Sequence, residues 1–424
     1  MRALLNFFLK LEKLKTNRRK GWSLYKIKDP SSTADHIFRA AILAWILNKQ
    51  KGLDEGRVIK TLLVHHLPDI SLGEQSPYEK LLPKHLVPEK RGSSIFQLAL
   101  GAQNRQEIQR RGQEQRAMKR VVSRLPKEFK EEIVSLWQGY SNQKSKIAKF
   151  TWQIGKTESY LQALEYWKSE DKIEQKFWTR WAKKYLRDPL IIKFRREIDH
   201  LFLSRKRKCD ERRMCDILDF IIETGELKRL KRRGWVLSAV KRPESVAQHT
   251  FQMTMIAWAI GQLKGLDTDR VVKIALAHDL CEVYAGDQTP YDPILTDSAK
   301  TNKKLASKPP RLPYLQKMEW LIKKKDEEWK ALVKLTSRLA KGWQEELVGL
   351  WVDFEEGLTK EGRFVYQVDK LVNLIQAIEY WKKDKNFPIN RWWVDIKERI
   401  DDSDLLKLVK ELDKYYSTLE KNKR

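Results

Sequence analysis

Two histidines and several carboxylates lie close together in the sequence between residues 242 and 292. A lone histidine, His249, is followed by the doublet His278-Asp279, and Glu282 comes four residues after His278. Imidazole and carboxylate groups together are suitable ligands for a divalent transition metal. A further carboxylate beside such an ion can move a proton to or from water. The stretch therefore predicts a metal centre with an acid or base next to it.

Two predicted helices would carry these side chains. The first has Pro243 in its opening turn, repeats apolar residues at helical spacing and ends at Gly265. The second runs from an N-cap at Asp267 to a stop at Gly286. The candidate ligands therefore lie on two consecutive helices joined by a short turn.

The spacing of the doublet restricts where an ion could lie. On a regular helix His278 and Asp279 point about 100° apart, so both reach one ion only at the seam between two helices. His249 would have to reach this seam from the first helix. Taken singly, a histidine on an apolar helix is more often a core residue than a ligand, but the whole spacing is more specific.

Four segments carry a resemblance to a known family: LKRLKRRGWV at 227–236, RPESVAQH at 242–249, AHDLCEVYAGD at 277–287 and FVYQVDKL at 364–371. They resemble the HD-domain metal-dependent phosphohydrolases, and within these the 5'-deoxynucleotidase branch. The resemblance spans most of residues 214–400. It implies a single divalent metal ion with four protein ligands: His249, His278, Asp279 and Asp369.

The same resemblance implies roles for residues around the metal. Glu282 would be the acid/base residue, and Asp287 a second polar group near the leaving oxygen. Arg232 and Trp235 would face the phosphate and the sugar of the substrate. Arg233 follows Arg232 directly, so which arginine reaches the phosphate stays open.

The chain also contains a long internal repeat. Met1–Tyr78 aligns without a gap with Met214–Tyr291, and about two in five positions are identical, which is far above chance. The likeness returns at FTWQIGKTESYLQALEYWK (150–168) and FVYQVDKLVNLIQAIEYWK (364–382). We therefore predict two copies of one domain.

The predicted organisation is a first repeat at 1–200, a basic linker at 201–213 and a second repeat at 214–424. No stretch shows the alternating pattern of a half-buried strand, so both repeats are predicted to be all-α. The copies differ over 79–125 and 292–335, where loops and helices are expected, and KPPRLP at 308–313 is a candidate border of the active site.

The first repeat differs where chemistry would take place. Two histidines are kept, but an anionic ligand is lost at Gly155, so we predict a catalytically inactive copy. The alternative is a metal site of three histidines with a new geometry. A fused inactive copy could serve as the partner in an intramolecular pseudo-dimer. The residues concerned are His36 and His65 (kept), and His66, Asp69, Glu74 and Gly155, which replace Asp279, Glu282, Asp287 and Asp369.

Composition limits the class of protein. The chain has 424 residues, 41% of them hydrophobic, and a formal charge of +28. Its three cysteines, Cys209, Cys215 and Cys281, show no paired spacing, which argues against a disulfide framework and favours the cytoplasm. The amino terminus predicts an amphipathic helix, and no segment approaches the ~20 apolar residues that span a bilayer.

These observations predict a hydrolase that releases phosphate from (deoxy)nucleoside 5'-monophosphates with Mn, Co, Mg, Fe or Zn. The preference for deoxyribose is implied by the resemblance alone. One alternative is another HD-type phosphohydrolase, acting on nucleoside triphosphates or cyclic nucleotides. Another is a non-catalytic protein that uses its positive charge to bind nucleotides or nucleic acid.

Overall fold

The computed structural model describes residues 1–73, 103–206, 208–294, 296 and 313–421. Within these ranges the regular elements are all helices, apart from two isolated bridges, Arg18 to Ser32 and Lys231 to Ser245. The predicted all-α fold is therefore confirmed. None of the helices in the described ranges is both long and apolar enough to cross a membrane. Glu74 and most of KPPRLP (308–313) lie outside the described residues.

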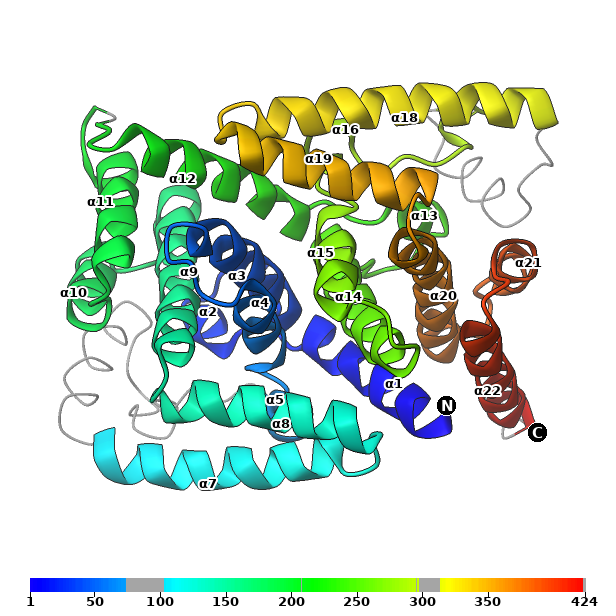
Figure 1. The fold of residues 1–424 in the computed structure, drawn as a ribbon, viewed down its shortest axis with the longest axis horizontal. Helices are drawn as coiled ribbons and strands as arrows, with labels where there is room; N and C mark the ends of the chain where they lie inside the picture. The colour runs from blue at the N-terminus through cyan, green and yellow to red at the C-terminus, as the bar shows by residue number, and fades with distance from the viewer. Residues whose placement is uncertain (74–102, 207, 295, 297–312, 422–424) are drawn as a thin grey trace. The chain divides into compact units, whose positions relative to one another are not determined.

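One compact unit spans Lys10–Ile221. At its centre α3 packs against α4 and α9, and α8 covers α4 and α9 (Figure 1). Its helices are α2 (Lys20–Leu24), α3 (Thr33–Asn48), α4 (Glu55–Val64), α5 (Asp69–Leu72), α7 (Gln103–Val122), α8 (Lys127–Asn142), α9 (Lys146–Glu170), α10 (Gln175–Tyr185) and α11 (Pro189–Leu203).

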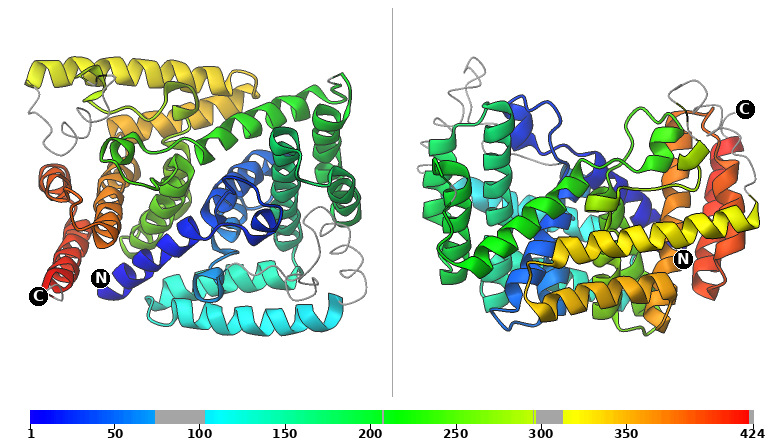
Figure 2. Two further views of the ribbon diagram at one scale, coloured as in Figure 1. Left: turned by 180° about the vertical axis from the view of Figure 1, so that it is seen from behind. Right: turned by 90° about the horizontal axis from the view of Figure 1, so that it is seen from above.

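The other unit comprises Met1–Leu9 and Ile222–Arg424. Here α14 packs against α15 and α20, and α19 covers α15 and α20 (Figure 2). Its helices are η1 (Gly225–Lys228), α13 (Arg233–Leu237), α14 (Val246–Leu263), α15 (Thr268–Ala277), α16 (Glu282–Ala285), η2 (Asp292–Ile294), α18 (Tyr314–Thr336), α19 (Lys341–Glu356), α20 (Lys360–Lys383), α21 (Asn390–Arg399) and α22 (Ser403–Lys421).

The two repeats have the same internal arrangement. Among the described residues, the main helix contacts of the first repeat have counterparts in the second: α3 on α9 matches α14 on α20, and α5 on α7 matches α16 on α18. The likeness extends to single hydrogen bonds. The backbone N of Ser31 donates to Tyr166 Oη at 2.8 Å, and that of Glu244 donates to Tyr380 Oη at 2.8 Å. The predicted tandem duplication is confirmed.

The first helix of each repeat is divided between the units. Helix α1 (Arg2–Thr16) is amphipathic as predicted, with Leu4, Phe8 and Leu11 buried. Met1–Leu9 belongs with the second repeat, where Gln252 Nε2 donates to Phe8 O at 3.3 Å. Helix α12 (Arg212–Thr224) is the first helix of the second repeat, but its residues up to Ile221 belong to the compact unit that contains the first repeat. The linker at 201–213 stays a prediction.

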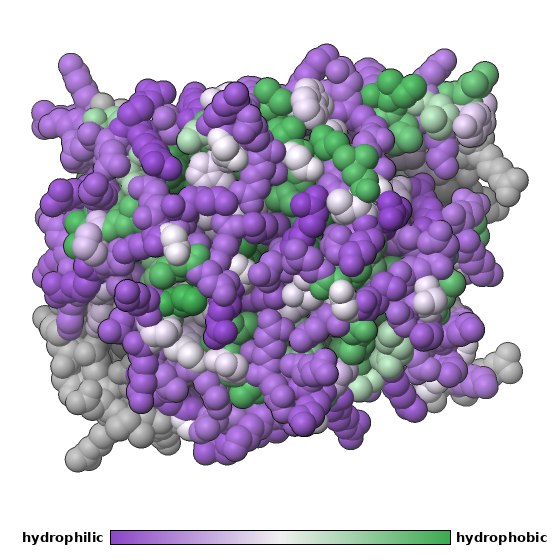
Figure 3. Space-filling model, viewed as in Figure 1, coloured by the Kyte–Doolittle hydropathy of each residue, from purple (hydrophilic) through white to green (hydrophobic). Residues whose placement is uncertain are grey.

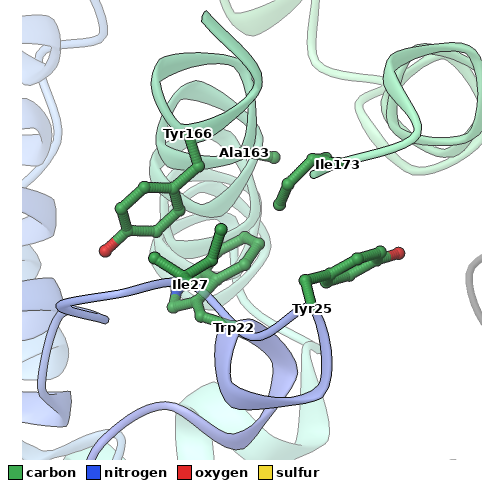
Figure 4. Close-up of a cluster of buried hydrophobic side chains, with 6 residues drawn as sticks. All are labelled: Trp22, Tyr25, Ile27, Ala163, Tyr166 and Ile173. Carbon is green, nitrogen blue, oxygen red and sulfur yellow. The ribbon is translucent and has the colours of Figure 1, made fainter. Parts of the chain in front are cut away.

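Aromatic side chains fix the short helix that precedes the long ones in each repeat. In the first repeat Trp22 meets Tyr166 edge-on, with ring centroids 5.4 Å apart. The second repeat keeps this pair as Trp235 and Tyr380, at 5.1 Å. Figure 4 shows the buried cluster of the first repeat, which comprises Trp22, Tyr25, Ile27, Ala163, Tyr166 and Ile173.

The cysteines are the point at which the structure corrects the sequence prediction. A disulfide joins Cys209 to Cys215, whereas Cys281 is free and buried. The chain reverses between α11 and α12, which brings the two cysteine Cα atoms to 6.1 Å. This reversal depends on where the helices end, and the spacing of six residues does not reveal it.

The surface reflects a composition in which 33% of residues are charged. On the face shown in Figure 3 hydrophilic residues predominate, and hydrophobic residues occur in scattered groups among them. Several of the exposed apolar residues lie on α18, including Leu315 and Ile322.

Candidate metal centre

Helix α14 carries the first candidate ligand. It begins at Val246 because Ser245 caps it: the Ser245 hydroxyl accepts from the Gln248 backbone, and the Gln248 side chain accepts from the Ser245 backbone. The predicted start around Pro243 is therefore too early. His249 lies one turn after this cap and is fully buried.

The second predicted helix is interrupted at the His-Asp doublet. Helix α15 is capped by Asp267, as predicted, but it ends at Ala277, and α16 begins only at Glu282. The prediction of one continuous helix to Gly286 is wrong over the turn between them. Because of this turn the two side chains of the doublet converge, with His278 Nε2 and Asp279 Oδ2 3.0 Å apart.

The structure brings the four predicted ligands together within the second repeat. One ligand atom from each of His249, His278 and Asp279 lies within 4.8 Å of the others. Asp369, from the middle of α20, places Oδ1 3.0 Å from His249 Nε2. Helices α14 and α20 and the turn after α15 thus supply two imidazoles and two carboxylates to one place.

The hydrogen bonding of these ligands fits a bound cation. Among the described residues, His249 Nδ1 and Nε2, His278 Nε2 and Asp369 Oδ1 are buried without a hydrogen-bond partner, which is unfavourable unless a ligand compensates. His249 Nε2 and Asp369 Oδ1 are close enough for a hydrogen bond but not aligned for one. His278 Nδ1 faces Ala275 O at 2.8 Å, which leaves Nε2 as its ligating atom.

Charges around the cluster keep its carboxylates ionised. Burial alone would raise the pKa of Asp279, but His278 and Arg232 lower it well below its usual range. Burial likewise opposes ionisation of Asp369, but the Lys370 ammonium, 2.6 Å away, helps to lower that pKa. Burial lowers the pKa of His249, which favours the neutral imidazole that binds metals.

The remaining imidazole behaves differently. Burial would lower the pKa of His278, yet the neighbouring Asp279 raises it. Because the metal binds the neutral imidazole, metal binding at His278 competes with protonation of its ring.

The two neighbouring arginines have different surroundings. Arg232 points inward: Nη1 donates to Asp279 Oδ2 at 2.9 Å, Nη2 donates to Asn373 Oδ1 at 3.3 Å, and the side chain is 14% exposed. Arg233 points away and pairs with Asp292, and its side chain is 44% exposed. The sequence left open which arginine reaches the cluster, and Arg232 is the one in contact with it.

Two further carboxylates adjoin the cluster. Glu282 is buried, and its Oε2 has no hydrogen-bond partner among the described residues. Burial, followed by the charge of Asp279, raises the pKa of Glu282 well above its usual range. Asp287 Oδ2 accepts from the Arg233 backbone and lies 3.6 Å from Arg232 Nε. Burial raises the pKa of Asp287 as well.

Trp235 lies inside the aromatic core of the second repeat. It is 2% exposed, stacks on Trp392 with ring centroids 4.9 Å apart, and donates from Nε1 to Glu244 at 2.9 Å. These contacts hold the backbone from which Arg232 extends. The sugar contact expected for Trp235 stays a prediction.

Two functional neighbours were not found from the sequence. The Lys370 ammonium donates a hydrogen bond to Asp369 Oδ2, and Asn373 Oδ1 accepts one from the guanidinium of Arg232. Both follow Asp369 on α20, at one and four residues. Position 373 is serine in the first repeat (Ser159), so a comparison of the copies is the signal that could have marked it.

The fold and the site together define an all-helical protein with a buried cluster of histidines and aspartates that could hold a metal. The HD domain family matches the chain twice, over residues 11–188 and 224–402. The chain belongs to this family, with one match in each repeat.

Similar proteins carry a specific name. The 5'-deoxynucleotidase HDDC2 of Danio rerio is 30% identical over 200 residues, which cover 47% of this chain and 87% of that protein. The Homo sapiens protein of the same name is 30% identical over 203 residues, or 48% of this chain and 87% of its own length. The 5'-deoxynucleotidase YBR242W of Saccharomyces cerevisiae is 29% identical over 178 residues, covering 40% and 64%.

Proposed function

We propose that the second repeat is a metal-dependent phosphohydrolase that removes the 5'-phosphate from (deoxy)nucleoside monophosphates. The observation that carries this proposal is the convergence of two buried imidazoles and two ionised carboxylates, of which His249 Nε2, His278 Nε2 and Asp369 Oδ1 lack hydrogen bonds among the described residues. The similarity to proteins named 5'-deoxynucleotidases supports the reaction and the substrate class.

His249, His278, Asp279 and Asp369 would hold one divalent ion, for which Mn, Co, Mg, Fe and Zn are the candidates. Such an ion, when bound, supplies Lewis acidity that lowers the pKa of water and offsets negative charge on phosphorus. The two carboxylates balance its charge, and Lys370 restrains the outer oxygen of Asp369. The ligand set does not by itself distinguish among these metals.

The reaction transfers the phosphoryl group from the 5' oxygen to water, so two protons must be moved. Glu282 takes the proton of the attacking water, since its raised pKa makes the carboxylate a stronger base than an ordinary glutamate. The oxygen–phosphorus bond to the sugar breaks, the departing 5' oxygen gains a proton with the assistance of Asp287, and Glu282 later returns its proton to solvent. Arg232 binds phosphate oxygens through its planar guanidinium. The products are a nucleoside and inorganic phosphate.

The first repeat lacks the groups for this chemistry. Gly155 stands where the second repeat has Asp369, and Asp69, the counterpart of Glu282, is already held by His66 at 2.7 Å. We therefore assign hydrolysis to the second repeat alone. The intramolecular pseudo-dimer and the cytoplasmic location stay predictions. A chain that migrates as a dimer in size-exclusion chromatography would count against the first of these.

The test is phosphate release from a panel of deoxy- and ribonucleoside monophosphates with manganese, cobalt or magnesium. It compares the native chain with Asp369→Ala and with a matched control, Asp395→Ala, which removes a partly exposed aspartate of α21 that pairs with Arg399. We expect release by the native chain and the control, and its loss in Asp369→Ala. Release that survives in Asp369→Ala would refute the assignment to this site.

A further inference from the structure

We propose that the first repeat holds a transition-metal ion of its own, bound by the three histidines His36, His65 and His66. The structure brings one ring nitrogen from each of them within 4.8 Å of the other two. The inference concerns a site without hydrolytic chemistry, and it does not depend on the activity of the second repeat.

The outer nitrogen of each ring is already engaged, which fixes how the rings face. His65 Nδ1 lies 2.5 Å from Leu62 O, and His66 Nδ1 lies 2.7 Å from Asp69 Oδ2. His36 Nδ1 contacts the buried carboxylate of Glu158 and lies 3.1 Å from Arg19 Nη1. A hydrogen-bond acceptor on Nδ1 selects the tautomer whose Nε2 carries the lone pair, as in histidines that bind metals.

The inner nitrogens lie close together. His36 Nε2 and His65 Nε2 are 3.3 Å apart, and the rings of His65 and His66 have centroids 4.2 Å apart. Two facing lone pairs repel each other unless a proton or a cation lies between them.

The first repeat also has a substitute for its missing carboxylate. A Cβ atom built on Gly155 would lie 3.8 Å from His65 Nε2 and 3.3 Å from Tyr140 Oη. Tyr140 on α8 occupies the place of Phe354 on α19, and each ring lies 5.0 Å from its histidine. Compared with the second repeat, the first repeat therefore has the Tyr140 hydroxyl next to the space that a carboxylate at position 155 would fill. We assign Tyr140 as the fourth group of the site.

This ligand set favours a metal that prefers nitrogen. Three imidazoles and one oxygen suit zinc or cobalt far better than magnesium or manganese, which prefer carboxylates. Glu158 lies behind His36 and is also paired with Arg39 and Arg19, and Asp69 lies behind His66. Because Asp69 is occupied in this way, it cannot act as Glu282 does. The side chain of His66 is 18% exposed, so the cluster is not sealed from solvent.

The test counts cobalt ions in the full chain. The protein is stripped with a chelator, loaded with cobalt(II), desalted and analysed for cobalt per chain, and its visible spectrum is recorded. A background of His249→Ala with Asp369→Ala removes two ligands of the second repeat. In this background we compare His66→Ala, Tyr140→Phe and a control, His200→Ala, which removes the α11 histidine that lies with Glu197 and Asp210 in another group able to hold a metal.

We expect one ion in the background variant and in the His200→Ala control, and none after His66→Ala. Tyr140→Phe should keep the ion with a shifted visible spectrum and an affinity lower by about tenfold or more, since even groups outside the ligand shell affect affinity by 10–100-fold. Zinc should raise the melting temperature of the background variant but not of its His66→Ala derivative. An ion that survives His66→Ala, or a background variant that binds none, would overturn the proposal.

Discussion

Replacement of Arg232 by alanine tests the central electrostatic argument, because its neighbour Arg233 provides an internal control. Arg232 is 14% exposed and donates to Asp279 at 2.9 Å. Removing one partner of a buried ion pair typically destabilises the folded state by about 3–5 kcal/mol, because the remaining charge is left unpaired. Loss of a positioned donor from a site of charge development lowers kcat by about 10²–10³-fold. We expect losses of this size in the metal-free stability and in phosphate release.

Arg233→Ala should behave differently, since this side chain is 44% exposed in its pair with Asp292. Exposed pairs contribute about 1 kcal/mol or less. Arg232→Lys should restore the charge but not the planar pair of donors, and should recover only part of the activity. The measurements are urea denaturation of the metal-free chain and phosphate release at saturating metal. Equal losses from Arg232→Ala and Arg233→Ala would refute the reasoning.

Two further predictions concern pH and packing. Glu282 must be ionised to accept a proton, and its pKa is raised above the ordinary value of 4.5 by burial and Asp279. The ratio kcat/KM should therefore fall as the pH is lowered through this raised pKa, with metal content checked at each pH, and a level profile down to pH 4.5 would contradict the role. Gly362→Ala should strongly destabilise the folded state, since the new Cβ would collide with the backbone oxygen of Asp353. Gly349→Ala should instead stabilise the folded state by up to about 1 kcal/mol, because its Cβ would enter open space. Thermal unfolding of the two variants decides this prediction, and equal melting temperatures would refute it.

Local patterns explain why much of the fold is predictable. The cap at Asp267, the ends at Gly265 and Gly286, and the apolar face of α1 all depend on residues within a few positions of one another. The break between α15 and α16 was missed, because the sequence there still has helical spacing. The reversal that joins Cys209 to Cys215 was missed for a related reason, since it depends on where two helices end.

The sequence by itself determined the duplication, the helical class and the types of the candidate ligands, because each is recorded in residue identity and spacing. Only the tertiary structure decided which groups meet. It turned Arg232 rather than Arg233 toward Asp279, and it set the hydroxyl of Tyr140 beside the space at Gly155. These contacts join residues that lie 47 and 15 positions apart, so packing between helices fixes them and no local pattern records them.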